Sequence, residues 1–419
     1  MRQYLPRLVD ELLKKELEAF GAVLITGPKW CGKTTTGFNQ ANSTLFLQNP
    51  DEREQNLSLA DIKPSLLLEG DKPRLIDEWQ DAPQLWDAVR FSVDQSGETG
   101  LYILTGSTTV DDSLIAHSGT GRISRLKMRT MSLFESGDSN GEVSISQLLN
   151  GEEISSKSQH TIEDISNLIV GGGWPASIEK SLEIKQRQVA GYCQAIVNTE
   201  ISTADGISRD SEKVYQVLRS YSRHISTQAT IQKITNDITH SFDSINRKTV
   251  GEYLEALKKI FVIEDLPAWS PRLRSKTSIS TSSTRHFVDP AIAAYFLNAN
   301  PDDLLNDLET MGLLFESLVI RDLRIYAESM DGSVFHYRDN SGQEADAILH
   351  FRNGKWAAIE VKLGNRAIEV GAQSLLKLAD KIDKDAMNEP VFLAVITGTG
   401  YAYQREDGVY VIPIGCLRD

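Results

Sequence analysis

One stretch constrains the fold of this chain more than any other, the run AVLITGPKWCGKTTTG from Ala22 to Gly37. Its apolar, β-prone first half ends at Gly27, four residues intervene, and Gly32-Lys33-Thr34 follow. A strand, a glycine-rich loop and a helix start at this spacing are typical of a P-loop. Gly27 and Gly32 let the backbone turn its N–H groups toward phosphate oxygens at a helix N-terminus, whose dipole favours negative charge. The sequence therefore predicts an N-terminal α/β domain that binds phosphate groups.

The side chains of this loop indicate its ligand. Lys33 is expected to reach the β- and γ-phosphates of ATP, and the Thr34 hydroxyl to hold Mg²⁺. Thr35, where the following helix is expected to begin, completes with Gly27 and Gly32 the predicted nucleotide-binding residues. The alternative interpretation is a glycine-rich strand-to-helix turn that binds nothing.

Two acids follow the next apolar run along the chain. Arg74-Leu75-Ile76 is the predicted end of a buried strand, and Asp77 and Glu78 come directly after it. Downstream of a P-loop, such a pair predicts a magnesium and catalytic site. Asp77 would hold the water shell of the magnesium ion, and Glu78 would polarise the attacking water as general base. A solvated turn is the alternative for two acids at the end of a strand.

Polar residues also end the next predicted strand, GLYILTGSTTV. A hydroxyl at the tip of a strand beside these acids can hydrogen-bond the γ-phosphate or the attacking water. Thr105 and Ser107 are both candidates for this role.

A basic segment follows, with Arg122, Arg125, Lys127 and Arg129 within eight positions. One hypothesis is that Arg122 or Arg125 is an arginine finger that reaches the nucleotide of a neighbouring subunit. The alternative is a solvated basic strand.

Length and charge limit the remaining possibilities. A chain of 419 residues is too long for one core and suggests about two to four domains. The net charge of −14 argues against a protein whose whole surface binds nucleic acid. It leaves room for a local basic face, because residues 201–290 carry thirteen Lys and Arg against ten Asp and Glu.

The N-terminus and the cysteines bear on the compartment. No apolar run approaches the length needed to span a bilayer, and the first twenty residues predict an amphipathic helix without the apolar core of a signal peptide. Cys31, Cys193 and Cys416 lie far apart without metal-ligand spacing. We therefore expect a cytoplasmic protein with free thiols and no membrane partner.

The middle of the chain is predicted to be mainly helical. Residues 137–159 are rich in Ser, Gly, Glu and Asn and predict a surface loop or linker that closes the first domain. Gly171 to Pro175 is expected to make a tight turn between two helices. From Ser211 to Trp269, three helices closing on a strand resemble a winged helix, whose third helix enters a DNA groove. That helix is expected to begin at Ser244 as N-cap, with Arg247–Lys248 in its first turns. A purely structural three-helix module is the alternative.

The C-terminal segment carries a second cluster of acids. A predicted amphipathic helix places Glu316 near its apolar face, and Asn353-Gly354 predicts a hairpin between the runs EADAILHF and WAAIEVKLG. Asp346 on the first strand, with Glu360 and Lys362 on one face of the second, resembles the metal site of PD-(D/E)xK nucleases. The resemblance implies that the carboxylates bind Mg²⁺ and that the lysine positions or activates water. Gln373 on the next helix fits it, whereas Ala345 replaces the proline expected before the first acid. An exposed ion pair on a hairpin is the alternative.

Taken in order along the chain, these motifs resemble those of one family. The resemblance rests on GPKWCGKT, LIDEWQDAPQLWDAVR, LTGS, HSGTGRI, GGGWP, EADAI and AIEVKLG. Together they are similar to the predicted AAA+ superfamily ATPases of bacteria and archaea that carry a C-terminal domain of unknown function with a restriction-endonuclease-like fold. The resemblance covers nearly the whole chain. It implies a homo-oligomer, expected to be a hexameric ring if an arginine finger acts in trans.

We therefore predict three parts of an α/β protein: an AAA-type P-loop ATPase domain at 1–150, a helical and winged-helix region at 160–275, and a restriction-endonuclease-like domain at 284–419. The predicted function is ATP-driven remodelling of DNA, with branched DNA such as a four-way junction as the expected partner. Two alternatives stay open. One is a nucleotide-controlled regulatory switch that binds a protein partner, and the other is an ATP-dependent defence nuclease.

Overall fold

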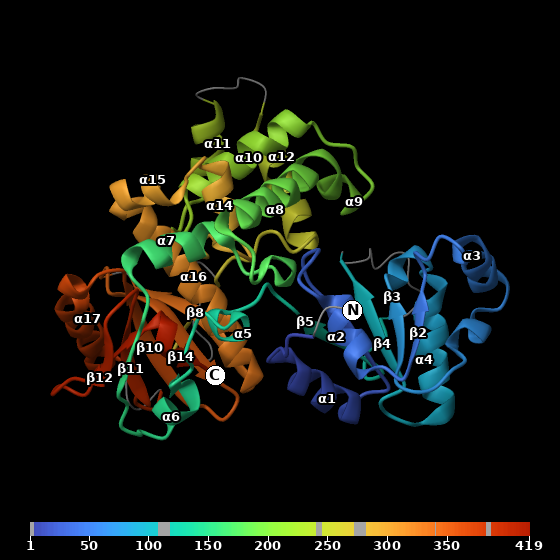
Figure 1. Ribbon diagram of the computed structural model, residues 1–419, viewed down its shortest axis with the longest axis horizontal. Coiled ribbons are helices and arrows are strands. Elements are labelled where there is room, and N and C mark those ends of the chain that lie inside the picture. The colour runs from blue at the N-terminus through green and yellow to red at the C-terminus, as the bar shows by residue number, and fades with distance from the viewer. Residues whose placement is uncertain (1–3, 108–117, 240–244, 272–281, 340, 383–386) are drawn as a thin grey trace.

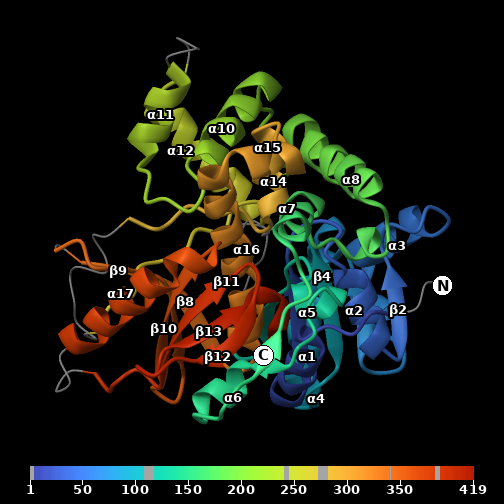
Figure 2. The same cartoon turned by 60° about the vertical axis from the view of Figure 1, so that its left-hand side comes forward.

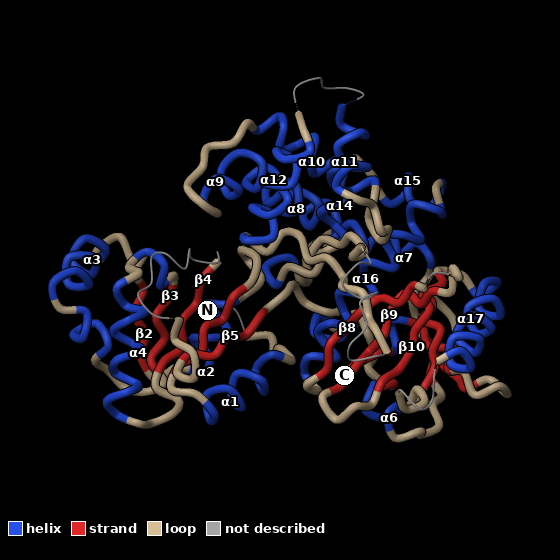
Figure 3. Tube along the Cα trace, turned by 180° about the vertical axis from the view of Figure 1, so that it is seen from behind, coloured by secondary structure: helices blue, strands red, loops and turns tan. Residues whose placement is uncertain are grey.

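The computed structural model describes residues 4–107, 118–239, 245–271, 282–339, 341–382 and 387–419. They form an N-terminal sheet domain, a helical region and a C-terminal sheet domain, drawn in blue, mainly green and yellow, and orange to red in Figure 1. Seen from behind in Figure 3, the two sheets lie in separate parts of the molecule, with helices above both. Among the described residues, no helix is both long enough and apolar enough to cross a membrane.

The N-terminal domain is built on a five-stranded parallel sheet with the strand order β2-β3-β4-β1-β5. Its strands are β1 (Ala22–Thr26), β2 (Ser43–Phe46), β3 (Arg74–Asp77), β4 (Tyr102–Gly106) and β5 (Ile123–Lys127). Its main helices are α1 (Val9–Ala19), α2 (Lys33–Gln40), α3 (Arg53–Ile62) and α4 (Gln84–Ser96). Every residue of the central strands β1 and β4 is buried, which is why the sequence shows them as continuous apolar runs.

Side chains of these strands alternate between two cores. Ala22 and Leu24 of β1 pack in one core with α4, and Val23 and Ile25 pack in the other with α1. This is the period of two expected of a strand covered on both faces. Because β1, β3 and β4 run parallel, their carboxyl ends meet at one end of the sheet.

The helical region consists of short helices that pack on one another. They are α7 (Ile162–Gly171), α8 (Leu182–Ala195), α9 (Ile201–Thr203), α10 (Ser211–Arg223), α11 (Ile231–Thr239), α12 (Arg247–Lys259), α14 (Pro290–Phe296) and α15 (Pro301–Asn306). After α12, the chain makes two antiparallel bridges, Ile263 with Phe287 and Leu266 with Thr284. Within the segment predicted as the C-terminal domain, α14 contacts α10 and α7, and α15 contacts α7.

The start of α12 differs from the expectation. Asn246, not Ser244, caps the helix, and its Oδ1 accepts a hydrogen bond of 3.0 Å from the Thr249 N–H. Ser244 itself lies outside the described residues. Both residue types cap helices well, so the sequence alone could not choose between two candidates so close together.

The C-terminal domain holds a seven-stranded mixed sheet with the order β7-β12-β13-β11-β10-β9-β8. Its C-terminal strands are β8 (Gly332–Arg338), β9 (Glu344–Phe351), β10 (Trp356–Lys362), β11 (Phe392–Thr397), β12 (Tyr401–Gln404) and β13 (Tyr410–Pro413). Helices α16 (Leu308–Ser329) and α17 (Ile368–Lys381) pack on opposite faces, as the turned view of Figure 2 helps to follow. The predicted hairpin is confirmed, because β9 and β10 pair antiparallel around the turn at Asn353-Gly354.

The segment 137–159 contains more structure than the loop we expected. It holds β6 (Val143–Ser144), α6 (Ile145–Leu149) and β7 (Ser156–Lys157). Strand β6 pairs with β14 (Leu417–Arg418), and β7 pairs with β12. Its polar composition suits two-residue edge strands, whose partners lie more than 200 residues away in the sequence.

Candidate nucleotide-binding site

The loop after β1 requires glycine at two positions. Gly27 has a φ of +152°, and a Cβ added there would lie 2.1 Å from the Met128 carbonyl oxygen. Gly32 has a φ of +103° and stands directly before α2, in the left-handed region that side chains rarely adopt. Backbone geometry therefore explains why glycine is needed at both positions.

Lys33 lies inside this loop. Lys33 is only 5% exposed. Its Nζ donates hydrogen bonds to the carbonyl oxygens of Gly27 and Pro28 at 2.9 and 2.8 Å. A buried ammonium group held by neutral carbonyls can exchange these partners for phosphate oxygens, which bear charge and accept stronger hydrogen bonds. The loop therefore fits a polyphosphate ligand.

The expected magnesium residues lie in contact with each other. Thr34 Oγ1 donates to Asp77 Oδ1 at 2.8 Å, although 43 positions separate them in the sequence. Thr105 Oγ1 donates to the same carboxylate oxygen at 2.5 Å. A hydroxyl and a carboxylate are oxygen ligands of the kind that Mg²⁺ prefers. Thr34 and Asp77 are thus suited to hold the ion, and Thr105 orients Asp77.

Glu78 follows Asp77 directly, and hydrogen bonds hold both its backbone and its carboxylate. Its φ of +54° is unusual for a residue with a side chain, and its N–H donates to Thr105 Oγ1 at 3.2 Å. Its carboxylate accepts hydrogen bonds from Gln80 Nε2 and, at 3.5 Å, from Ser107 Oγ. Both polar residues proposed for the tip of β4 therefore contact the acidic pair, Thr105 more closely than Ser107.

Gln80 is a site residue that the sequence reasoning missed. Beyond its bond to Glu78, its Oε1 is buried and finds no hydrogen-bond partner within the described part of the chain. The only sequence signal was its place two residues after Glu78, and in a turn of that kind any polar residue is common.

A cavity of 750 Å³ joins these residues, within the usual range for small-molecule sites. From the N-terminal domain it is lined by Gly32, Lys33, Thr34, Thr35, Glu78 and Ser107, among others. From the helical region it is lined by Pro175, Ala176, Gln188 and Thr203. Gly171 to Pro175 does lie between α7 and α8, but not as the tight turn we expected: Gly171 ends α7, residues 172–174 are irregular, and Pro175 begins a short 3-10 helix (Pro175–Ser177). Pro175 and Ala176 form part of a wall of this cavity that we did not foresee.

Three family models match successive parts of the chain. Residues 19–136 match a model described as an AAA domain. This segment is similar to AAA domains, and it carries the P-loop described above. Residues 162–303 and 311–417 match two domains of unknown function, DUF8612 and DUF4143, so neither match assigns an activity to the remainder.

Relatives and solved structures resemble the chain distantly. An uncharacterized protein of Haemophilus influenzae is 21% identical over 338 residues, which are 81% of this chain and 75% of the relative. Uncharacterized proteins of Mycobacterium bovis and Mycobacterium tuberculosis are each 22% identical over 360 residues, 84% of this chain and 72% of theirs. A Walker-type ATPase of Pyrococcus abyssi has a TM-score of 0.40 and 13% identity, over 68% of this chain and 94% of that one.

The two finger candidates lie away from the ATPase domain's own cavity lining. Arg122 Nε contacts Asp94 Oδ1 at 2.7 Å, and the Arg125 guanidinium lies 5.8 Å from the centre of the Trp86 ring. Arg122 precedes β5, whose first residue is in register with Ala22, so it lies at the sheet edge opposite the P-loop. An action of either arginine on a neighbouring subunit stays a prediction.

Arg129 is buried, whereas Arg122, Arg125 and Lys127 of the same basic segment are exposed. Its guanidinium is buried and forms ion pairs of 2.6 Å with Glu264, next to the helical region's bridges, and with Glu328 at the end of α16. Burial opposes ionisation of Glu264, but the charges of Arg129, Arg324 and Lys127 outweigh it and hold the pKa of Glu264 well below its usual range. Arg129 therefore ties the ATPase domain to both other parts of the chain.

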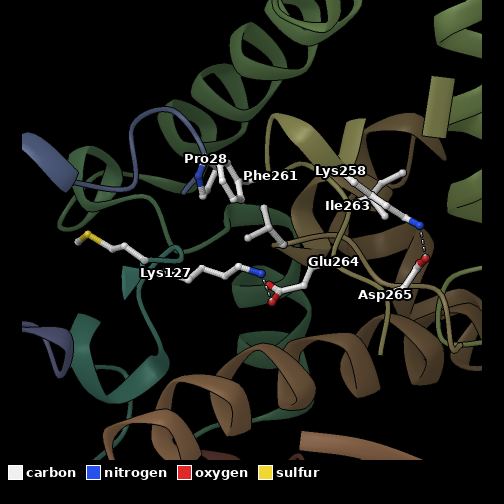
Figure 4. A pocket seen from close by; sticks show the side chains of 9 residues that line it. Pro28, Lys127, Lys258, Phe261, Ile263, Glu264 and Asp265 are labelled. Atoms are coloured by element: carbon white, nitrogen blue, oxygen red, sulfur yellow. Dashed lines mark hydrogen bonds and ion pairs between the residues drawn. The ribbon is translucent and has the colours of Figure 1, made fainter. Parts of the chain in front are cut away.

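A second cavity, of 310 Å³, adjoins this junction (Figure 4). It is lined on one side by Pro28 and Lys127 of the ATPase domain and on the other by Phe261 and Glu264. In the close view, Lys127 reaches across to Glu264, at 3.0 Å. Because Pro28 also accepts a hydrogen bond from Lys33, this junction lies directly behind the P-loop.

In the C-terminal domain, the acids Asp346 and Glu360 both lie close to Lys362. Lys362 Nζ lies 2.5 Å from Glu360 Oε2 and 3.6 Å from Asp346 Oδ2. Burial and the charge of Asp346 raise the pKa of Glu360 to about 8 and that of Glu316 well above its usual range. Gln373 donates instead to Glu369 on its own helix, at 2.8 Å.

This cluster is an ion-pair arrangement in the structure. The Lys362 ammonium occupies the position between the two carboxylates that a cation would need. Across the part of the chain that the structure describes, no group of three or more His, Cys, Asp and Glu side chains has an arrangement that could hold a metal ion. A magnesium site at Glu316, Asp346 and Glu360 with Lys362 stays a prediction.

Proposed function

We propose that this protein binds ATP with Mg²⁺ and hydrolyses the γ-phosphate. The observation that carries the proposal is that Lys33, Thr34 and Glu78 line one 750 Å³ cavity, with Asp77 in contact with Thr34, and that these residues come from the ends of two strands, β1 and β3. Magnesium bound by Thr34 and Asp77 would neutralise charge on the phosphates.

The chain's own side chains have distinct tasks in this reaction. Lys33 transfers its hydrogen bonds from the loop carbonyls to phosphate oxygens and so stabilises the charge of the transferred group. Glu78 orients the attacking water and accepts its proton. Gln80 and Ser107 hold the Glu78 carboxylate, and Thr105 holds both Asp77 and the Glu78 backbone.

Separate measurements of ATP binding and of phosphate release distinguish these roles. Lys33→Ala should abolish ATP binding, whereas Glu78→Gln should bind ATP and release little or no phosphate. Glu98→Gln, an exposed acid in the loop before β4, is the matched control and should behave as the unmodified protein. Equal phosphate release from Glu78→Gln and the control would remove the proposed base.

We propose further that hydrolysis is coupled to remodelling of DNA, with branched DNA such as a four-way junction as substrate. Helices α10, α11 and α12 followed by two antiparallel bridges match the order of elements in a winged helix. Arg247 and Lys248 are exposed in the first turn of α12, where such a helix contacts DNA. The support is the position of these two residues.

This step is tested by DNA-stimulated ATP turnover. Arg247→Glu with Lys248→Glu should abolish stimulation by DNA and leave turnover without DNA unchanged. Lys259→Glu, at the other end of the same helix, is the control for a charge reversal away from this face and should leave the stimulation in place. Stimulation that survives the double change would exclude this face of α12.

We also propose that Arg122 and Arg125 act as arginine fingers in a homo-oligomer that forms a hexameric ring. Their exposure at the edge strand β5 leaves them accessible to a neighbouring subunit. Arg122→Ala should slow turnover without weakening ATP binding, and light scattering with ATP should report the mass of six chains. A monomer that turns over ATP at full rate would refute both.

A nucleotide-controlled switch is the second candidate function. Lys29 of the P-loop forms an ion pair of 2.6 Å with Glu200 of the helical region, and Arg129 ties the ATPase domain to both other parts. Nucleotide state could thus set the arrangement of the parts and recruit a protein partner. Nucleotide-dependent capture of a partner, with no effect of DNA on turnover, would favour the switch.

An ATP-dependent defence nuclease is the third. It requires Asp346, Glu360 and Lys362 to exchange their ion pairs for a metal ion. Nicking of DNA that depends on Mg²⁺ or Mn²⁺ and is lost in Asp346→Ala would favour it. Intact DNA in the presence of both ions and ATP would exclude it.

A further inference from the structure

One part of the nucleotide cavity has no role in the chemistry described above. Beyond the residues already assigned to the chemistry, the cavity is lined by Lys29, Trp30, Gln48 and Asp81 of the N-terminal domain and by Pro175, Ala176, Gln188 and Thr203 of the helical region. Lys29 is already paired with Glu200. Trp30 and the four residues of the helical region are aromatic, small or neutral polar, so their side of the cavity suits an uncharged, flat group better than a phosphate.

Trp30 presents an unusual amount of aromatic surface here. Its side chain is 59% exposed, although tryptophan is one of the residue types that proteins bury most. Its ring centre lies 6.3 Å from that of Tyr192, whose ring in turn lies 4.9 Å from Trp174. A chain of aromatic contacts from the buried Trp174 therefore holds Trp30 at the cavity, where a flat ligand can stack on it.

Gln188 supplies a polar group on the opposite domain. Its Oε1 is buried and has no hydrogen-bond partner among the residues that the structure describes, which is rare because such an atom loses its bonds to water without replacement. Because Gln188 lines the same cavity, a ligand with an N–H group can satisfy this oxygen. The amide carries both an acceptor and a donor, so it recognises a ligand edge that offers a donor beside an acceptor.

We propose that Trp30 and Gln188 form the base-binding part of the nucleotide site and select adenine. The inference rests on the proposed function, since it assumes that the phosphates lie at Lys33. Adenine offers an amino group beside a ring nitrogen, and a glutamine amide binds that pair with two hydrogen bonds. Guanine offers two acceptors at the same edge and would leave Oε1 facing an oxygen or a nitrogen without a proton.

The arrangement makes base recognition a joint property of two domains. Trp30 comes from the ATPase domain, and Gln188 comes from α8 of the helical region. The ion pair between Lys29 and Glu200 joins the P-loop to the helical turn that follows α8, at 2.6 Å. Nucleotide bound in this way contacts both domains and stabilises their contact.

Calorimetric titration of the full chain tests the proposal. The background is Glu78→Gln, so that ATP is not consumed, and the ligands are ATP, GTP and inorganic tripolyphosphate, each with Mg²⁺. We expect ATP to bind about tenfold more tightly than GTP. Trp30→Ala should weaken both nucleotides about tenfold and leave tripolyphosphate unchanged, and Trp30→Phe should keep most of the affinity. Gln188→Ala should remove the preference for ATP, whereas Gln186→Ala, on the same helix but outside the cavity lining, should keep it.

Other outcomes overturn the proposal in distinguishable ways. Equal affinity for ATP and GTP, or a preference that survives Gln188→Ala, would refute base selection by Gln188 while Lys33-dependent binding of tripolyphosphate upholds the proposed function. If Trp30→Ala weakens tripolyphosphate as much as ATP, Trp30 shapes the loop and does not stack on a base. If the background protein binds none of the three ligands, the proposed function and this inference both fail. Melting temperatures of all variants establish that each is folded.

Discussion

Replacing Arg129 with methionine should be among the most destabilising single changes in this protein. The Arg129 side chain is 4% exposed and donates four hydrogen bonds of 2.6 to 2.8 Å, two to Glu264 and two to Glu328. Methionine fills a similar volume but removes the charge. The Glu264 carboxylate, 14% exposed, would then keep Lys127 at 3.0 Å and Arg324 at 3.7 Å.

The magnitude follows from the burial of the acid that is left behind. Removing one partner of a buried ion pair destabilises a protein by about 3 to 5 kcal/mol, because the other charge stays buried without compensation. We expect about 3 kcal/mol, the lower limit, since two cations still face Glu264. Glu328 adds little, because its side chain is 38% exposed.

Lys127→Met is the matched control. Lys127 contacts the same Glu264 from the same segment, but its side chain is 42% exposed, and exposed pairs contribute about 1 kcal/mol or less. Urea unfolding followed by tryptophan fluorescence measures the first transition of each variant. Adding Glu264→Gln to Arg129→Met should recover part of the loss by removing the buried charge. Equal losses in Arg129→Met and Lys127→Met would refute the argument from burial.

Three further predictions concern the P-loop, the acidic pair and a buried histidine. Gly27→Ala should lower the free energy of unfolding by about 1 to 3 kcal/mol and abolish ATP binding, because the new methyl group would meet the Met128 carbonyl; an unchanged urea midpoint would contradict it. Thr105→Val should lower ATP turnover about 10- to 100-fold by releasing Asp77, and should raise the Mg²⁺ concentration needed for half-maximal turnover; an unchanged magnesium titration would show that the hydroxyl is dispensable. Burial lowers the pKa of His336 from 6.5 to about 4, so the folded state binds fewer protons than the unfolded state between these values, and stability should fall by about 3 kcal/mol as the pH drops from 6.5 to 4. His336→Gln should flatten that part of the stability curve relative to the parent, and parallel curves would refute the assignment.

Local pattern was sufficient to predict which residues come together at the ends of β1 and β3. Gly27, Lys33, Asp77 and Glu78 follow strands with continuous apolar runs, and parallel strands bring their carboxyl ends to one edge. The confirmed hairpin of β9 and β10 likewise follows from alternation and an Asn-Gly turn, both of which are properties of neighbouring residues.

Long-range partners could not be read in the same way. The sequence shows Arg129 only as part of a basic segment. Its partners Glu264 and Glu328 lie 135 and 199 positions away, so the neighbouring residues give no sign of the ion pairs. Pro175, Ala176 and Gln188 line the nucleotide cavity only because the helical region packs over the P-loop. Gln80 is local to Glu78, but its neighbours in the sequence do not reveal which way its amide points.

The most direct test of the central claim is steady-state ATP hydrolysis by the full chain, alone and with single-stranded, duplex and four-way-junction DNA. The account predicts Mg²⁺-dependent turnover that Glu78→Gln abolishes while ATP still binds, and a several-fold increase that is greatest with the junction. Turnover that is unaffected by Glu78→Gln would contradict the site. Turnover that depends on Glu78 but is indifferent to every DNA would uphold the ATPase and contradict its coupling to DNA.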